Sequence, residues 1–345
     1  MTNQNNNWEF GLRTEGHIGE ARNTESVILG EGKYQYKLSG KDWGELPNGW
    51  TYKEATSVAV DHSDNIWIFN RGTCPVIVMD PTGKIINTWG EGLFSNPHSV
   101  TVAPDGNIFL VDNGDSTVRK YTPEGELLMM LGTPNEPAPK MSGIPFNRPT
   151  KVAIDPNNGD IYVTDGYSNA RVHKYTQEGK LLFSWGESGT NEGQFNIVHD
   201  IAIDSEGWLY IADRENHRIQ IFDSNGKYET QFGNLSRAAA LSIKKEGNTD
   251  VIYVGEYFCG IGTNDIGTDL GPRVSILNTK GEIIARVGKE SYGEQAGRFF
   301  SPHGIAVDSK GNIYVAEVSW TDYGSRMDPP KILRSMQKLE LINKG

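Results

Sequence analysis

The chain has 345 residues, with 40 glycines, 16 prolines, two cysteines and a formal net charge of −11. This acidic balance disfavours nucleic acid or an anionic membrane as a partner, because like charges repel, and leaves a small molecule as the expected one. Two cysteines exclude a disulfide framework, and neither an export signal nor a membrane-spanning run is visible, so we expect a cytoplasmic protein of undetermined oligomeric state.

The predicted elements begin with a polar arm. Residues 1–33 predict a flexible arm or clasp, and residues 34–345 predict a single domain. The first strand-like segment, YQYKLSGKDWG at 34–44, ends in Trp-Gly. Six segments then repeat one pattern, in which an alternating apolar run is followed by a turn and a second apolar run. These segments start at Thr56, His98, Thr150, His199, Ala239 and His303.

Each repeated unit contains short apolar runs joined by tight turns, which is typical of four antiparallel strands. Each ends in an aromatic or aliphatic residue followed by Gly, at Trp43-Gly44, Trp89-Gly90, Leu131-Gly132, Trp185-Gly186, Phe232-Gly233 and Val287-Gly288. Four strands repeated six times predict an all-β fold, a six-bladed β-propeller. Because the last unit lacks a fourth strand, we expect the N-terminal strand to complete the C-terminal blade and close the ring.

Two insertions interrupt the repeats. A Pro-rich stretch at 133–150 leads into the third blade, and a Gly-rich stretch at 256–274 lies within the fifth. Loops of this length in a compact repeat are often functional lids, so we expect both to wall a pocket.

Three histidines, His98, His199 and His303, each stand eight residues before the same glycine of the repeat. They are about 100 residues apart, twice the ~40–50 residues of a propeller blade, which places them on alternate blades. Equivalent residues on alternate blades converge on the central axis. Three imidazoles leave one coordination position open, as in catalytic zinc sites. The alternative is that each histidine only bonds to the neighbouring blade.

The segments around these histidines resemble a known family. The most specific segments are Pro97-His98, VTDGYSNARV at 163–172, GQFNIVHDIAI at 193–203, IADRENHRI at 211–219 and Ser301-Pro302-His303. The repeats look like NHL repeats, and from about residue 50 to 320 the chain resembles peptidyl-α-hydroxyglycine α-amidating lyase, the lyase domain of the peptidylglycine α-amidating enzymes. The resemblance implies zinc held by the three histidines and cleavage of a carbinolamide to an amide and glyoxylate.

The resemblance also implies the other catalytic residues. The family's active-site tyrosine falls on Tyr167, which would accept the substrate hydroxyl proton while zinc lowers the pKa of that hydroxyl. Arg71 and Arg214 match the family's arginines and would stabilise a phenolate or clamp a carboxylate. Arg214 has an alternative, structural role in the D-R-x-N-x-R turn of the repeat. The acidic strand ends are expected to join blades or to orient the imidazoles; these are Asp112, Asp165, Asp213, Glu256 and Glu317.

Three positions depart from the family's pattern. Ser301 replaces a methionine near the metal, and Gly304 replaces an aspartate that serves a structural calcium ion. A calcium site is therefore doubtful, although carbonyls near Val58 and Val100 and the carboxylate of Asp200 would remain to hold one. Ser168 stands at one of the family's cysteine positions. We expect a small carbinolamide or ureidoglycolate-type substrate.

Two other functions remain open. A different zinc-dependent hydrolase or hydratase would use the same propeller to activate water, and product analysis would distinguish it from a lyase. A non-catalytic NHL binding scaffold would have no reason to hold stoichiometric metal. Three histidines would also accept iron, cobalt or copper.

Overall fold

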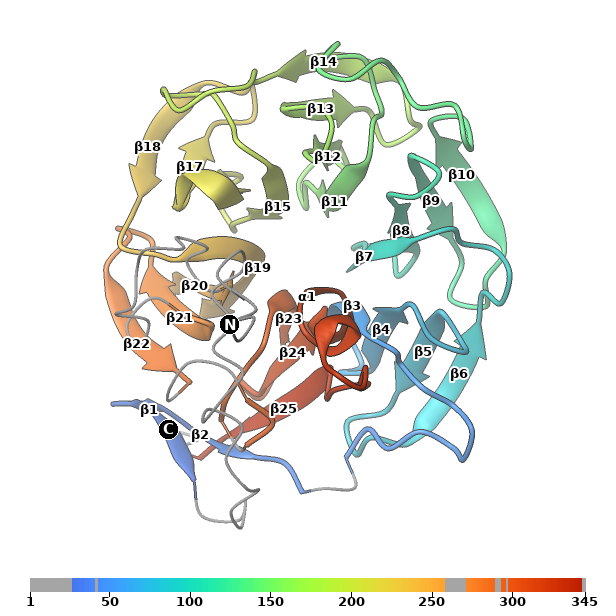
Figure 1. Ribbon diagram of the computed structural model, residues 1–345. Coiled ribbons are helices and arrows are strands. Elements are labelled where there is room, and N and C mark those ends of the chain that lie inside the picture. Colours follow the sequence, from blue (N-terminus) through green and yellow to red (C-terminus); the bar gives the residue numbers. More distant parts are fainter. Residues whose placement is uncertain (1–26, 41–42, 258–270, 289–292, 296, 343–345) are drawn as a thin grey trace, which may run out of the picture.

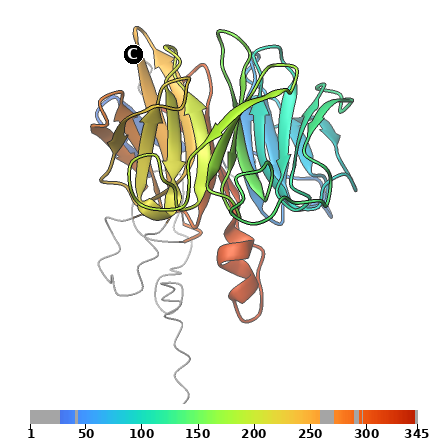
Figure 2. The ribbon, with the colours of Figure 1, turned by 90° about the horizontal axis from the view of Figure 1, so that it is seen from above.

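The computed structural model describes residues 27–40, 43–257, 271–288, 293–295 and 297–342. Its strands form six antiparallel sheets arranged around one central axis (Figure 1), which confirms the predicted six-bladed propeller. Seen from the side, the sheets form a single ring (Figure 2). Among the described residues no helix is both long enough and apolar enough to cross a bilayer.

The first three blades are regular four-stranded sheets whose inner strands are β3, β7 and β11. The first contains β3 (Ala55–Val60), β4 (Ile66–Asn70), β5 (Val76–Met79) and β6 (Ile85–Trp89). The second contains β7 (Pro97–Val102), β8 (Ile108–Asp112), β9 (Thr117–Tyr121) and β10 (Leu127–Leu131). The third contains β11 (Pro149–Ile154), β12 (Ile161–Asp165), β13 (Arg171–Tyr175) and β14 (Leu181–Trp185).

The fourth and fifth blades continue the pattern, and the sixth adds a helical excursion. The fourth contains β15 (Val198–Ile203), β16 (Leu209–Asp213), the 3₁₀ turn η3 (Arg214–Asn216), β17 (Arg218–Phe222) and β18 (Tyr228–Phe232). The fifth contains β19 (Arg237–Glu246), β20 (Thr249–Tyr257), β21 (Arg273–Asn278) and β22 (Ile283–Val287). The sixth contains β23 (Pro302–Val307), β24 (Ile313–Glu317), α1 (Ser319–Asp322), η4 (Gly324–Arg326) and β25 (Met336–Leu341).

The N-terminal strands close the ring, as predicted. Strand β2 (Tyr34–Leu38) pairs antiparallel with β25, and β1 (Ile28–Glu31) extends the same sheet. Strand β1 lies within the stretch expected to be an arm; residues 1–26 are outside the described residues, and the boundary at residue 34 stays a prediction.

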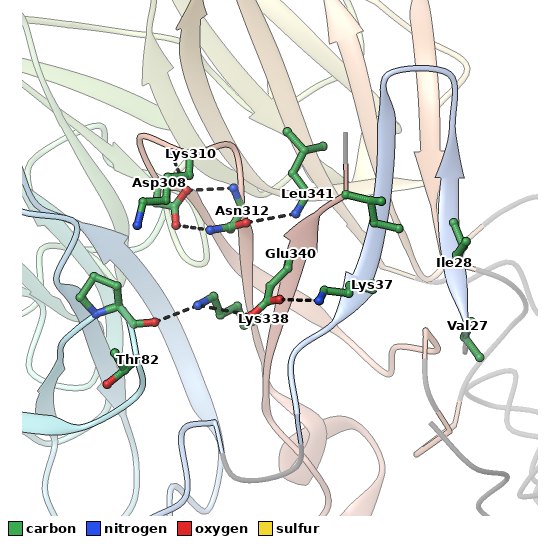
Figure 3. Close-up of a pocket in the computed structure, with 12 residues that line it drawn as sticks. Val27, Ile28, Lys37, Thr82, Asp308, Lys310, Asn312, Lys338, Glu340 and Leu341 are labelled. Carbon is green, nitrogen blue, oxygen red and sulfur yellow. Dashed lines mark hydrogen bonds and ion pairs between the residues drawn. The ribbon is translucent and has the colours of Figure 1, made fainter. Parts of the chain in front are cut away.

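A cavity of about 820 Å³ lies beside this closure (Figure 3). Its lysines are paired: Lys37 lies 3.4 Å from Glu340, and Lys338 donates to the carbonyl of Pro81 on the first blade at 2.8 Å. These contacts tie the last strand to both neighbours, so we assign the cavity to ring closure.

The core lies between neighbouring sheets. Phe69 on β4 and Leu110 on β8 are fully buried in one apolar layer that joins the first two blades. Close packing of this kind holds each blade at a fixed angle to the next. The inner strands are therefore rigid supports for side chains that point to the axis.

Candidate metal centre

All six inner strands carry a register shift near their first residue. The residue at each shift has no partner of its own on the second strand, and β-bulges of this kind redirect a side chain. The shifted residues are Thr56, His98, Thr150, His199, Ala239 and His303. The repeat thus presents these six positions equivalently at one end of the axis.

Histidines and backbone carbonyls alternate around this ring. The Nδ1 atom of His98 lies 2.7 Å from the carbonyl oxygen of Thr150, that of His199 lies 2.6 Å from Ala239, and that of His303 lies 2.6 Å from Thr56. A carbonyl only accepts, so each Nδ1 carries the proton and donates it. Each Nε2 atom therefore keeps its lone pair and is the nitrogen available to a metal.

The three imidazoles meet at one point. Their ligand nitrogens all lie within 4.8 Å of one another, and all three rings are buried. Burial, followed by the neighbouring His303 and Arg71, lowers the pKa of His98 well below its ordinary range. Burial and Arg71 likewise lower the pKa of His303 to about 3. The rings are thus held neutral, the state that binds a metal.

Tyr167 places its hydroxyl between two of these nitrogens. The oxygen lies 3.0 Å from Nε2 of His199 and 3.2 Å from Nε2 of His98. Gly166 makes this position accessible, since a Cβ atom there would lie 1.8 Å from the carbonyl oxygen of Val198. One phenol proton can serve only one of two acceptors. The remaining lone pairs face the same space, which fits a bound cation such as zinc.

Arg71 reaches the centre from the first blade. Its Nη1 pairs with Glu54 at 2.7 Å, and its Nε donates to the carbonyl oxygen of Pro97, next to His98. The guanidinium is thus fixed beside the second blade's metal-facing histidine. It retains donors for a carboxylate, because a guanidinium offers five N–H groups.

Arg214 reaches the centre from the fourth blade. Its guanidinium lies 5.6 Å from the ring centroids of both Tyr167 and Tyr257, and its Nε donates to Glu215 at 2.9 Å. Arg237 also pairs with Glu215. Arg218, not Arg214, makes the structural pair with Asp213 in this turn. Arg214 is therefore outside the structural pair of this turn and lies against the two tyrosine rings.

The first insertion is pinned against the tyrosine turn. Met141 donates its N–H to the carbonyl of Ser168, and Asn169 donates to the carbonyl of Ile144 at 2.9 Å. Arg148, which follows the loop, places its guanidinium 5.0 Å from the ring centroid of Tyr167. The second insertion, 256–274, lies largely outside the described residues.

The acidic residues at the strand ends were expected to join blades or to orient the imidazoles, but among the described residues they do neither. Asp112 accepts from the N–H groups of Ser95 and Asn96, and Glu317 accepts from those of Phe300 and Ser301. Asp165, Asp213 and Glu256 accept from Asn147, Asn196 and Ser236 in the same manner. They fix the chain that enters the inner strand of their own blade, while carbonyls orient the imidazoles.

The axis below the histidines does not fit calcium. Lys151 donates its ammonium to the carbonyl of Val100 at 3.0 Å, one of the oxygens expected to hold that ion. Burial raises the pKa of Asp200 to about 6, which the charge of Lys151 opposes. At Gly304 a Cβ atom would lie 2.6 Å from Cα of Ser57, so the position has no room for an aspartate side chain unless the backbone shifts. The ammonium group of Lys151 thus occupies the position that a calcium ion would take.

Sequence reasoning missed four residues near the centre. Arg148, Arg237, Tyr257 and Asp322 come from loops and strand ends beside the predicted residues. Tyr257 is buried, and its ring centroid lies 6.1 Å from that of His303. None of the four stands in a repeated motif. Arg148 and Tyr257 lie within the two insertions that the sequence singled out, whereas Arg237 and Asp322 had no sequence signal.

Comparison with known families supports the repeat assignment. Residues 94–121, 146–175 and 195–222 match the NHL repeat. The chain is a six-bladed propeller that contains NHL repeats. Its matched segments include the strands that carry His98 and His199.

Known relatives of this NHL-repeat propeller include lyases. Peptidyl-alpha-hydroxyglycine alpha-amidating lyase 1 of Drosophila melanogaster is 32% identical over 266 residues, which cover 71% of this chain and 47% of the relative. NHL repeat-containing protein 3 of Homo sapiens is 29% identical, with 76% of both chains covered. The chain spans about half the length of the first relative. It resembles the amidating lyases, as the sequence motifs predicted.

Solved structures share the fold of this NHL-repeat propeller. A streptogramin B lyase aligns with a TM-score of 0.53 and 16% identity, covering 93% of this chain and all of that one. An auxiliary nutrient binding protein from Bacteroides ovatus aligns with a TM-score of 0.58 and 15% identity, covering 90% and 76% of the two chains. At this identity the likeness concerns the fold alone.

Proposed function

We propose that the chain is a zinc-dependent carbon–nitrogen lyase. It cleaves a carbinolamide, of the α-hydroxyglycine or ureidoglycolate type, to an amide and an α-oxo acid such as glyoxylate. The observation that carries this proposal is the hydroxyl of Tyr167, 3.0 and 3.2 Å from the Nε2 atoms of two of three convergent histidines. Similarity to proteins named amidating lyases supports the same reaction class.

Each residue has a defined task in this reaction. His98, His199 and His303 would hold zinc, which supplies Lewis acidity that lowers the pKa of the substrate hydroxyl. Tyr167 accepts the hydroxyl proton, since its oxygen already lies beside two of the histidines. Arg71 binds and orients the substrate carboxylate from the edge of the site.

Electrostatics around Tyr167 support its role as a base. The guanidinium carbon of Arg214 lies 5.6 Å from its ring centroid, and that of Arg148 lies 5.0 Å from it. These two guanidinium groups attract the negative charge that a tyrosine base carries on its oxygen. We therefore assign Arg214 to the stabilisation of the phenolate.

The proposal includes a small-molecule substrate and a cytoplasmic setting, with neither nucleic acid nor membrane as a partner. The acidic balance of the chain disfavours polyanionic partners, and Cys74 is a free thiol. Fractionation of cells that express a tagged chain tests the compartment. Recovery in a secreted or membrane fraction would contradict it.

A test of the reaction is the release of products from N-acyl-α-hydroxyglycine. We expect glyoxylate and the amide in equal amounts from the zinc-loaded chain, and neither product from a His199→Ala variant. Zinc-loaded protein that releases neither product would contradict the proposal.

A second candidate is a hydrolase or hydratase on the same site. The observation that favours it is a polar pair beside the third histidine, where Ser301 donates to Asp322 at 2.7 Å. A pair of this kind would suit the handling of water. Product analysis decides between the two, because only carbon–nitrogen cleavage without hydrolysis yields the amide and the α-oxo acid together.

A further inference from the structure

A short helical excursion covers one edge of the metal centre. It follows β24, and Glu317 at the end of β24 pairs with Pro302, the residue before His303. The excursion therefore leaves the ring at the same end as the histidines, and Figure 2 shows it as the red helical segment that projects from one face. Tyr323 anchors it in a buried cluster with Phe300 and Leu333.

Thr321 fixes this excursion to the first blade. Its N–H and its hydroxyl each donate to Glu54 at 2.7 Å, and Glu54 also pairs with Arg71 at 2.7 Å. Helix α1 is thus held by the carboxylate that positions a predicted catalytic arginine. The next residue along the chain is Asp322.

Asp322 turns its carboxyl group toward the metal centre. Its Oδ2 accepts from the hydroxyl of Ser301, two residues before His303, at 2.7 Å. Within the described part of the chain its Oδ1 has no hydrogen-bond partner. Its charge acts on Tyr257, whose ring centroid lies 6.1 Å from that of His303. Among the described residues this second carboxyl oxygen is therefore unpaired, next to the serine that precedes His303 by two positions.

We propose that Asp322 is a catalytic acid that protonates the departing nitrogen, a role that rests on the proposed lyase function. When the substrate O–H bond breaks, its electron pair forms the C=O bond and Tyr167 takes the proton. The C–N bond breaks with its pair on nitrogen, which takes the proton of Asp322. The net change moves one proton from oxygen to nitrogen, and exchange with water resets both side chains.

The surroundings of Asp322 suit a proton donor. Burial raises the pKa of its carboxyl, and the nearby Glu54 raises it further, while the hydroxyl of Ser301 and the guanidinium groups of Arg214 and Arg237 oppose the shift. Tyr257 also faces it. The carboxyl thus keeps its proton to higher pH than an exposed aspartate, for which about 3.9 is ordinary.

The test compares Asp322→Asn with wild-type enzyme on ring-substituted N-benzoyl-α-hydroxyglycines. Electron-withdrawing substituents make the amide nitrogen a better leaving group that needs less protonation. We expect kcat to fall roughly 100-fold for the unsubstituted substrate, the scale of one lost acid, and far less for a nitro-substituted one. An Asp328→Asn variant, which changes an exposed carboxylate of the same excursion, is the matched control and should behave as wild type.

A Ser301→Ala variant gives a second measurement. The hydroxyl of Ser301 lowers the pKa of Asp322, so its removal should raise that pKa. Since an acid must be protonated to act, kcat falls as pH rises through this pKa. We expect the alkaline limb of the kcat profile to move to higher pH in Ser301→Ala and to disappear in Asp322→Asn.

The outcomes separate the two proposals. If the wild type turns over and the kcat of Asp322→Asn falls equally for all leaving groups, or does not fall, the role of Asp322 is overturned and the lyase function stands. Absence of glyoxylate from the zinc-loaded wild type would overturn the lyase function and the role of Asp322 together. A deficit that shrinks as the leaving group improves supports both.

Discussion

Tyr167 is the residue on which the proposed chemistry depends most. Its hydroxyl stands 3.0 Å from His199 because Gly166 lets the turn pack against the carbonyl of Val198. The guanidinium of Arg214 lies 5.6 Å from its ring centroid. Proximity to the metal-facing nitrogens and to a cation are the two features that a tyrosine base requires.

A Tyr167→Phe variant should lose activity and keep the site. The change removes one oxygen and no ring atoms, so the histidines and their carbonyl partners stay in place. We expect kcat to fall at least about 100-fold, the usual contribution of a general base, with zinc content near that of the wild type. Turnover near the wild-type value would show that another group takes the proton.

At the residue scale the sequence predicted the donors and missed what orients them. His98, His199 and His303 are visible because the repeat places them at equivalent positions. The carbonyls that hold them belong to Thr150, Ala239 and Thr56, and a backbone carbonyl has no sequence signature. The histidine side chains could be predicted from the sequence, whereas the backbone carbonyls that orient them were visible only in the structure.

At the scale of elements, the inner strands carry the site. Each has its register shift where the site residue stands, so one backbone feature repeated six times builds the ring of alternating histidines and carbonyls. Strand β23 must also approach β3 closely, since a Cβ atom at Gly304 would lie 2.6 Å from Cα of Ser57. The close approach brings His303 to the carbonyl of Thr56.

A Gly304→Ala substitution should therefore destabilise the protein. The added methyl group must displace the backbone of β3, and overpacking of this kind costs about 1–3 kcal/mol. The matched control is Gly233→Ala, where a Cβ atom meets nothing within 4 Å among the described residues. We expect the control to be neutral or stabilising by up to about 1 kcal/mol. Equal free energies of unfolding in urea for both variants would contradict the close approach.

The helical excursion shows the limit of prediction from repeats. Residues 319–326 follow a strand that the repeat predicts, but they belong to no repeated unit, so no periodicity indicated where Asp322 would lie. Lys151 does lie in a repeated segment, the one that starts at Thr150, but the repeat did not indicate its contact with the carbonyl of Val100. The positions of residues that depart from the repeated pattern could not be predicted from the sequence.

At the scale of the whole molecule, the N-terminal hairpin holds the ring closed. Strand β2 supplies the fourth strand of the sixth blade, with β1 outside it, and Tyr36 on β2 is fully buried in the cluster that joins the fifth and sixth blades. The metal centre needs histidines from three blades. Its geometry therefore depends on a closure made far from it along the chain.

Two substitutions in this hairpin should differ sharply. Tyr36→Ala removes a buried ring and should lower the free energy of unfolding by about 3–5 kcal/mol. Ile28→Ala, on the paired strand, changes a side chain that is 54% exposed and should cost no more than about 0.5 kcal/mol. Urea unfolding checks both values. A similar cost for the two would argue against a closure that depends on the hairpin core.

The central claim is that three blades converge to hold one metal ion. The most direct test is the metal content of the purified chain, measured by mass spectrometry beside its His199→Ala and His62→Ala variants. His62 is an exposed histidine outside the centre and serves as the control. The account predicts about one zinc per chain in the wild type and in His62→Ala, and its loss in His199→Ala. Metal that persists in His199→Ala, or no metal in any of the three after growth with zinc, would contradict it.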